Sequence, residues 1–278
     1  MPAERIAENL AFINWTVLTA LAIGSFGAVV LASLRTQATR GFLAFTAACA
    51  VLLGVLAFLS DQALPVTLGD SPIIANTSFD APRRVALVVF ILLAAAYTVA
   101  VTRRRRAPLL AAAALASASA VLVCGALAWG GGSFGAVPLL IQLAVLAVAT
   151  GGVFAAMILG HWYLVTPKLP EAPLILISRG LLAVVALQVV FFAVWVSTGA
   201  GPGANGPFNV LVGPWALFVW LRLIVGLIFP LVVSWAAVQT ARTRSMESAT
   251  GLLYINVGTI AAGTILAAGL YFGAGLLV

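Results

Sequence analysis

Long apolar runs alternate with short polar segments along the whole chain. About 20 apolar residues, at 1.5 Å of rise per residue, cross a hydrocarbon core of roughly 30 Å. The runs are rich in Ala, Leu and Gly and lack the strict polar–apolar alternation of barrel strands, so they predict helices. We expect eight spans, near residues 10–34, 41–60, 83–102, 108–129, 137–165, 173–198, 213–238 and 249–276.

The composition agrees with a chain whose solvent is lipid. Hydrophobic residues make up 63% of the sequence and charged residues only 8%, whereas a soluble domain has roughly 25% charged residues. The predicted class is an all-α integral membrane protein. Cys49 and Cys124 both lie inside apolar runs, so the sequence implies neither a disulfide framework nor a zinc site.

The positive charges are distributed unevenly over the connections. Those after the first, third, fifth and seventh spans are basic, whereas the others carry acids together with Arg83 and Arg84, or no charge. The positive-inside rule then predicts a multi-pass protein of the cell (inner) membrane with both termini outside the cytoplasm. The net charge of +7 therefore indicates contact with anionic lipids at the cytoplasmic face, and we exclude nucleic acid as a partner. The basic residues are Arg35 and Arg40, residues 103–106, Lys168, and Arg242 and Arg244.

Several arginines recur at one spacing. Arg40-Gly-Phe-Leu-Ala and Arg179-Gly-Leu-Leu-Ala stand 139 residues apart, and the same offset pairs Arg83 with Arg222. This indicates two parallel four-helix repeats of the same orientation. The alternative is a chance match in a sequence of low complexity. The predicted halves are residues 1–136 and 137–278.

A candidate ligand site lies around the fifth and sixth spans. His161, the only histidine, ends the fifth span. A proline-rich turn, Pro167–Pro173, then leads to Arg179 on the sixth span. We expect His161 to lie near Arg179 or this turn, in a polar pocket that binds a quinone, a haem or a lipid headgroup. One histidine allows a five-coordinate haem or one with a second ligand from elsewhere, so a metal is expected only if haem is present. The candidate residues are His161, Trp162, Tyr163, Lys168 and Arg179.

A simpler explanation accounts for the same residues. Aromatic rings gather at the membrane interface without any further role, and a long arginine side chain extends to the headgroups. In that case His161, Trp162 and Tyr163 form an aromatic belt, while Lys168 and Arg179 only fix the orientation.

Arg222 is the second unusual residue, because it lies well inside the seventh expected span. An arginine there costs about 2.5–3.5 kcal/mol and usually faces a partner or a watery cavity. None of the expected spans contains an Asp or Glu, so the partner would be a lipid phosphate, a cofactor, another subunit or backbone carbonyls. Alternatively the span begins later and Arg222 extends outward as Arg83 would. Pro230 should kink the same helix, because it cannot donate to the carbonyl of Gly226.

The sequence contains no P-loop, metal-ligand cluster or Ser/His/Asp set, so we do not expect catalysis by this chain alone. The eight-span, four-plus-four plan is similar in outline to the membrane subunits of polysulfide-reductase-type quinone enzymes, a likeness of helix count only. The first hypothesis is therefore an accessory subunit of a respiratory or photosynthetic electron-transfer complex, bound to other membrane subunits. The alternatives are a transporter or lipid-handling protein with an anionic substrate near Arg222, and a structural or assembly subunit.

Overall fold

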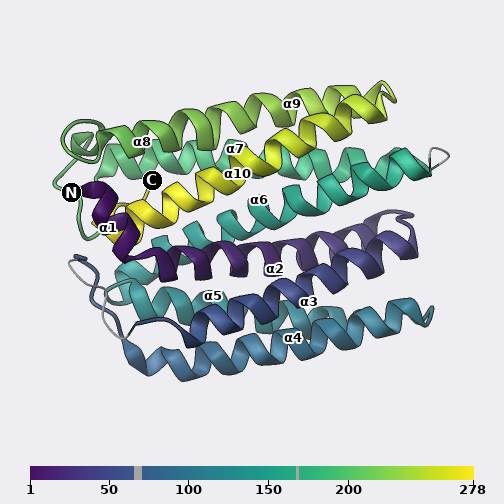
Figure 1. The fold of residues 1–278 in the computed structure, drawn as a ribbon, viewed down its shortest axis with the longest axis horizontal. Helices are drawn as coiled ribbons and strands as arrows, with labels where there is room; N and C mark the ends of the chain where they lie inside the picture. The colour runs from purple at the N-terminus through teal and green to yellow at the C-terminus, as the bar shows by residue number, and fades with distance from the viewer. Residues whose placement is uncertain (66–70, 167–168) are drawn as a thin grey trace.

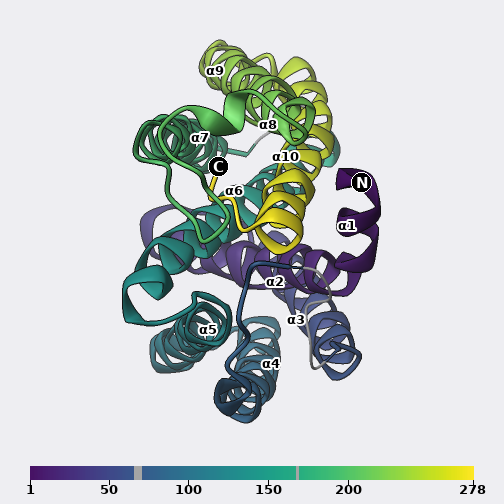
Figure 2. The ribbon, with the colours of Figure 1, turned by 90° about the vertical axis from the view of Figure 1, so that its left-hand side faces the viewer.

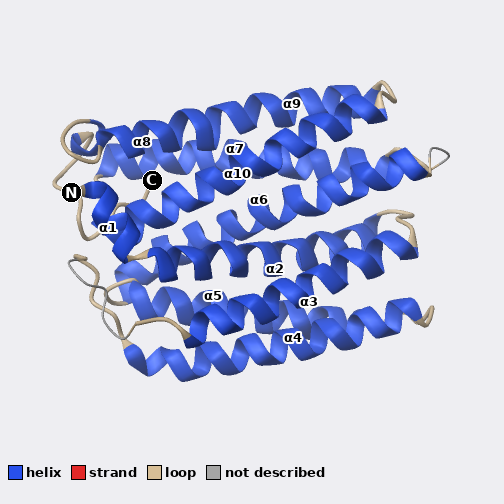
Figure 3. Ribbon diagram, in the orientation of Figure 1, coloured by secondary structure: helices blue, strands red, loops and turns tan. Residues whose placement is uncertain are grey.

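A computed structural model describes residues 1–65, 71–166 and 169–278, and these residues form helices without strands (Figure 3). Eight of the described helices are long and apolar enough to cross a membrane, which confirms the expected number of spans. The long helices are α2 (Leu10–Arg35), α3 (Arg40–Gln62), α4 (Asp80–Thr102), α5 (Pro108–Trp129), α6 (Ser133–Val165), α7 (Ala172–Thr198) and α10 (Met246–Ala274). The seventh span is made of α8 (Ala216–Leu223), the π-helix η3 (Ile224–Ile228) and α9 (Phe229–Arg242). The short elements are α1 (Pro2–Glu8), η1 (Thr77–Phe79) and η2 (Asn209–Leu211).

The long helices run along one common axis, so the bundle has two distinct ends (Figure 1). Both termini lie at the left-hand end, which we call the terminal end. The connections α2–α3, α4–α5, α6–α7 and α9–α10 lie at the opposite end, which we call the basic end. The cation-rich connections thus gather at one end, as the prediction of orientation requires.

The chain forms two groups of four spans, with α2–α5 in one and α6–α10 in the other (Figure 2). The central contact between the groups is made by α2 and α6. A Cβ on Gly24 would lie 1.8 Å from the carbonyl oxygen of Ala147, and one on Gly151 would lie 2.1 Å from the amide nitrogen of Ser25. Glycine at both positions therefore lets the two backbones touch. The boundary predicted between residues 136 and 137 falls in the first turn of α6.

The helices α4 and α9 end in the same way. Arg104 and Arg244 adopt φ values of 59° and 60°, in the left-handed region where glycine is usual. In both turns the next amide donates to a carbonyl five residues back, at 2.9 and 3.0 Å, which is the pattern of a Schellman motif. Two arginines therefore hold a conformation that costs a non-glycine residue about 1 kcal/mol.

An aromatic cluster joins the two groups near the terminal end. Trp129 of α5 packs edge-to-face against Trp15 and Phe12 of α2 and against Phe272 of α10, with ring centroids 4.8 to 5.7 Å apart. The hydroxyl of Tyr271 donates to the carbonyl oxygen of Trp129 at 2.8 Å. Aromatic pairs of this geometry add about 0.5–1.5 kcal/mol each to their area burial, so this cluster fixes α10 against the first group.

Candidate functional site

His161 lies on the outer surface of the bundle at the basic end. Its side chain is exposed, and its Nδ1 lies 3.4 Å from the hydroxyl oxygen of Tyr254 on α10. The contact that the structure gives the imidazole is therefore to α10, and not to Arg179 or the proline-rich turn.

Trp162 and Tyr163 face different neighbours from His161, because successive residues of a helix are about 100° apart. The ring of Trp162 lies against Gly41 on α3, where a Cβ would come within 2.5 Å of it. Tyr163 is buried, and its hydroxyl donates to the carbonyl oxygen of Pro170 in the turn before α7. The tyrosine thus makes the contact with the turn that the sequence led us to expect of His161.

Of the two basic residues in this group, Lys168 lies outside the described residues and Arg179 is exposed on α7. The described members of the predicted site therefore point toward α3, α10, the proline-rich turn and the surface. Neither of the two large cavities described below includes any of them.

Arg222 is 2% exposed, so it is buried in the bundle and does not extend outward. Its Nη2 donates to Oε1 of Gln188 at 3.0 Å and its Nη1 to the carbonyl oxygen of Gly226 at 3.1 Å. Pro230 has no amide hydrogen to give to that carbonyl, and the guanidinium takes its place. Nε makes a long contact of 3.5 Å to the main-chain oxygen of Val278, which also accepts from the side chain of Gln142 at 3.0 Å.

The space around this guanidinium is filled. A Cβ on Gly263 of α10 would lie 2.8 Å from Nη1 of Arg222 and 2.7 Å from the Cα of Gly226. Residues 275–278 fold back into the bundle, and the side chains of Leu276 and Val278 are buried. The carbonyl of Gly226, the amide of Gln188 and the main-chain oxygen of Val278 therefore contact Arg222, which agrees with the sequence alternative of backbone partners. Arg222 does not line either of the two cavities described below.

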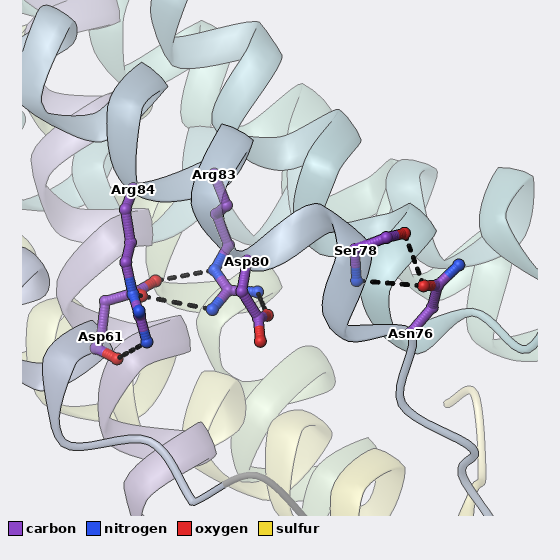
Figure 4. Close-up of polar contacts among 6 residues, drawn as sticks. All are labelled: Asp61, Asn76, Ser78, Asp80, Arg83 and Arg84. Carbon is purple, nitrogen blue, oxygen red and sulfur yellow. Dashed lines mark hydrogen bonds and ion pairs between the residues drawn. The ribbon is translucent and has the colours of Figure 1, made fainter.

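Arg83 is also buried, at 1% exposure, and its partner is a carboxylate that the sequence analysis placed outside the spans. Asp61 lies in the last turn of α3 and is fully buried. Its Oδ2 accepts from Nε of Arg83 at 2.7 Å, and its Oδ1 accepts from Nε of Arg84 at 2.8 Å (Figure 4). The expectation that no span contains an acid was wrong, because α3 continues past residue 60 and carries Asp61 into the bundle.

The charges of this cluster are balanced by its own members. Asp80 accepts from Nη1 of Arg83 at 2.8 Å, so two carboxylates balance two guanidinium groups. The guanidinium carbon of Arg83 lies 4.6 Å from the ring centre of Trp129 and 5.6 Å from that of Trp15, which adds cation–π attraction. The arrangement ties α3 and α4 to α2 and α5 at the terminal end and leaves no charge for a ligand.

A cavity at the basic end differs from this charge-balanced cluster, because its charged lining residues are all arginines. It has a volume of about 780 Å³ and lies among α2, α3, α4 and α5, within the size range of ligand pockets. Four arginines surround it: Arg40 at the start of α3, and Arg104, Arg105 and Arg106 in the α4–α5 connection. All four are exposed, so their charges remain accessible from that end.

The floor of this cavity is apolar. It is lined by Val30 from α2, Leu43 from α3, Val101 from α4 and Leu115 from α5. The lining of α5 extends from Pro108 to Leu115, which is about 10 Å of helix at 1.5 Å per residue. The cavity thus combines an apolar floor with a cationic mouth, by which we mean Arg40, Arg104, Arg105 and Arg106.

The start of α5 adds positive potential to the mouth. Its N-cap, Ala107, makes no side-chain capping hydrogen bond, and Ala107 and Pro108 both line the cavity. The amides of Leu109 and Leu110 therefore have no partner within the helix, and the N-terminal end of a helix carries a partial positive charge. Such a helix end is favourable for an anion.

The two groups of spans differ in their acids at this end. The sequence has no Asp or Glu between residues 8 and 61, or between residues 80 and 171, so the basic end of the first group contains none. In the second group Nε of Arg244 lies 3.1 Å from Oε1 of Glu171. The two left-handed arginines therefore have different surroundings: Arg244 is paired with an acid, whereas Arg104 lines the cavity.

Tyr97 of α4 gives the cavity an internal polar group. Its side chain is 4% exposed, lines the cavity and packs edge-to-face against Phe26 with centroids 5.3 Å apart. Its hydroxyl makes no hydrogen bond to any other described residue and is not one of the buried polar atoms that lack a partner, so the oxygen is accessible from the cavity. The sequence analysis missed Tyr97, and it interpreted the arginines as topology signals that contact anionic lipids, without a defined cavity. The absence of acids near these arginines was the signal that could have identified them.

A second cavity, of about 770 Å³, lies at the terminal end. Arg5 is the one arginine among its lining residues, which also include Ser71, Asn205, Asn209 and Leu276. The two candidate cavities thus differ in charge, and the one at the basic end is by far the more cationic.

The chain matches no protein-family model, no curated protein and no solved structure. Its function must therefore be inferred from the residues and their geometry.

Proposed function

We propose that this chain is a lipid-handling membrane protein that holds an anionic amphiphile in the cavity at the basic end. The observation that carries the proposal is the cationic mouth, where four arginines and the uncapped start of α5 meet without an acid. The apolar floor would receive the first part of the hydrocarbon chain, and the hydroxyl of Tyr97 would bond to the headgroup or its ester. By the positive-inside rule this site lies in the cytoplasmic leaflet.

The chemistry of the mouth favours a phosphate-bearing headgroup. Arginine presents a rigid fork of N–H donors that matches the oxygens of phosphate in pairs, and its charge is permanent. A soluble anion would gain nothing from the buried Val30, Leu43 and Val101. An amphiphile satisfies both parts of the cavity, which is why we prefer it to a free ion.

The proposal can be tested by lipid retention during purification. The protein is purified in mild detergent, exchanged into zwitterionic lipid doped with phosphatidylglycerol, and examined by native mass spectrometry. The double variant Arg104→Gln/Arg105→Gln should lose most of its bound anionic lipid. Tyr97→Phe should lose several-fold, because one hydrogen bond contributes about 0.5–1.5 kcal/mol.

The matched control is Arg179→Gln/Arg242→Gln, which removes two exposed arginines from the helices of the second group. It should retain lipid like the wild-type protein. Equal loss in both double variants would mean that general surface charge attracts the lipid, and the proposed site would be wrong.

A second candidate function is the accessory subunit of an electron-transfer complex, with a quinone, haem or lipid at His161. It is favoured by one observation: the exposed pair His161–Tyr254 presents an imidazole and a phenol, 3.4 Å apart, at the outer surface of the bundle. There a lipid-soluble ligand or another membrane subunit would have access to both. A Soret band, or quinone extracted in stoichiometric amount, would support it, and purified protein with neither would exclude a bound redox group.

We also propose that the two groups of spans are parallel repeats. Three correspondences support this: the buried arginines Arg83 and Arg222 on the third span of each half, the matching turns after α4 and α9, and the contact between the first spans at Gly24 and Gly151. Residues 1–132 and 133–278, co-expressed as two polypeptides, should then assemble into a complex. Failure of either half to insert without a covalent link would argue against two four-helix units.

A further inference from the structure

The charge at the mouth exceeds what a common phospholipid supplies. A phosphodiester headgroup such as phosphatidylglycerol carries one negative charge and two free oxygens. The cavity is lined by Arg40, Arg104, Arg105 and Arg106, and each guanidinium can bind two oxygens side by side. One phosphodiester would therefore occupy only a minority of these donors and would neutralise one of the four positive charges.

The positions of the arginines indicate an extended anion. Arg40 begins α3, whereas Arg104 to Arg106 belong to the connection between α4 and α5, so donors from two separate connections line one cavity. The free amides at the start of α5 add a further donor set next to Pro108. Two phosphoryl groups in a row would span such a mouth better than one, since each group could be bound from a different connection.

The surroundings of Arg104 differ from those of its counterpart Arg244. Both residues hold the left-handed conformation in which glycine is usual, with φ at 59° and 60°. The corresponding Arg244 is paired with Glu171. At Arg104 the sequence offers no acid in the α2–α3 or α4–α5 connection, so no carboxylate from these connections competes with a ligand for its guanidinium.

We propose that the amphiphile held at the basic end is a lipid diphosphate, whose two phosphoryl groups occupy the arginine-lined mouth while its chain begins on the apolar floor. This inference rests on the proposed function and narrows its ligand class. One phosphoryl group lies between Arg40 and the start of α5, and the other lies against Arg104 to Arg106.

The experiment compares four probes on the full chain in zwitterionic nanodiscs: farnesyl diphosphate, farnesyl monophosphate, phosphatidylglycerol and inorganic pyrophosphate. Dissociation constants are measured by isothermal titration calorimetry. Farnesyl diphosphate should bind at least tenfold more tightly than either farnesyl monophosphate or phosphatidylglycerol. Pyrophosphate should bind at least tenfold more weakly than farnesyl diphosphate, because it lacks the chain that the floor receives.

Single variants at the two sides of the mouth give a specific readout. Arg40→Gln and Arg105→Gln should each bring the affinity for the diphosphate close to that for the monophosphate, while Arg179→Gln leaves the difference intact. A loss of all binding in both single variants, without a change in preference, would count against two separate phosphoryl positions.

The outcomes separate the two proposals. If the monophosphate and phosphatidylglycerol bind as tightly as the diphosphate, and all three depend on Arg104 and Arg105, the diphosphate inference is wrong and the lipid site stands. If pyrophosphate equals the lipid diphosphate, the site takes a soluble anion and the lipid assignment is wrong. If no probe responds to the arginine variants, the proposed function itself fails.

Discussion

Arg83 and Asp61 form an ion pair inside the bundle, with Nε and Oδ2 2.7 Å apart and side-chain exposures of 1% and 0%. The pair connects the first turns of α4 to the last turn of α3, and the rings of Trp15 and Trp129 lie beside the guanidinium. Two charges without water are costly to bury, and their geometry must be good to offset that cost. This pair fixes the terminal end of the first group of spans.

Removing one member of the pair should destabilise the protein strongly. Asp61→Asn leaves the guanidinium of Arg83 buried with only Asp80 to balance two arginines. Breaking a buried pair in this way costs about 3–5 kcal/mol. The free energy of unfolding, measured by denaturant titration of the detergent-solubilised protein, should fall by this amount.

The control for this change is Asp80→Asn. Asp80 contacts the same guanidinium at 2.8 Å, but its side chain is 32% exposed, whereas Asp61 is fully buried. Asp80→Asn should therefore cost less than Asp61→Asn, because it leaves the fully buried half of the cluster intact. If Asp80→Asn costs as much as Asp61→Asn, burial is not the reason for the strength of the pair.

The eight spans could be predicted because each depends on local composition. An apolar run of sufficient length has few stable structures in lipid other than a helix, and all eight runs became helices. The partners of the buried arginines could not be predicted in the same way. Asp61 stands at the edge of an apolar run, and a shift of a few residues in the helix end decides whether it is in the loop or in the core.

The candidate site was harder to predict than the spans, because it depends on which helices pack together. Neighbours in sequence such as His161 and Trp162 looked like one site, yet they face different helices. The cavity at the basic end is assembled from four helices, so only tertiary packing brings Arg40 to Arg104. The sequence does show that Asp and Glu are absent near these arginines, but it does not show that the arginines line one cavity.

The crossing of α2 and α6 predicts opposite effects for two nearby glycines. Gly24→Ala places a methyl group 1.8 Å from the carbonyl oxygen of Ala147, so the helices must separate, at a cost of about 1–3 kcal/mol. Gly27→Ala meets no atom within 4 Å and should leave stability unchanged or raise it by up to about 1 kcal/mol, because alanine favours the helix.

The same contrast is available on the partner helix. Gly151→Ala would bring its Cβ to 2.1 Å from the amide nitrogen of Ser25, whereas Gly152→Ala meets nothing within 4 Å. Thermal unfolding of all four variants in one detergent gives the comparison. Equal midpoints within either pair would show that α2 and α6 do not cross at these glycines.

The orientation of the bundle can be tested with single cysteines in a background where Cys49 and Cys124 are replaced by Ala. Ser78 is exposed in η1, directly before α4, and Ser245 is exposed in the α9–α10 connection of the basic end. Because the basic end should face the cytoplasm, an impermeant maleimide added to intact cells should label Ser78→Cys and not Ser245→Cys. Labelling of Ser245→Cys alone would invert the predicted orientation.

The role of His161 can be separated from that of a general aromatic ring. His161→Phe keeps a ring at the interface but removes both nitrogens, and Tyr254→Phe removes only the hydroxyl that lies 3.4 Å from Nδ1. If the pair binds a quinone or haem, both variants should lose ligand by up to about a hundredfold in occupancy while inserting normally. Full ligand content in His161→Phe would assign the imidazole to the aromatic belt.

Arg104→Gly should separate stability from ligand binding. Glycine adopts the left-handed conformation of this position without strain, so the free energy of unfolding should rise by about 1 kcal/mol. The variant also loses one of the guanidinium groups that line the cavity, so the retention of anionic lipid should fall.

Arg244→Gly is the matched change in the second group. It relieves a similar backbone strain but loses the ion pair to Glu171, which offsets about 0–1 kcal/mol of the gain. Its lipid retention should equal that of the wild-type protein. The unfolding free energy and the bound lipid are measured on the same two preparations, by denaturant titration and by native mass spectrometry. A more stable Arg104→Gly protein with undiminished lipid would show that the side chain has no part in binding.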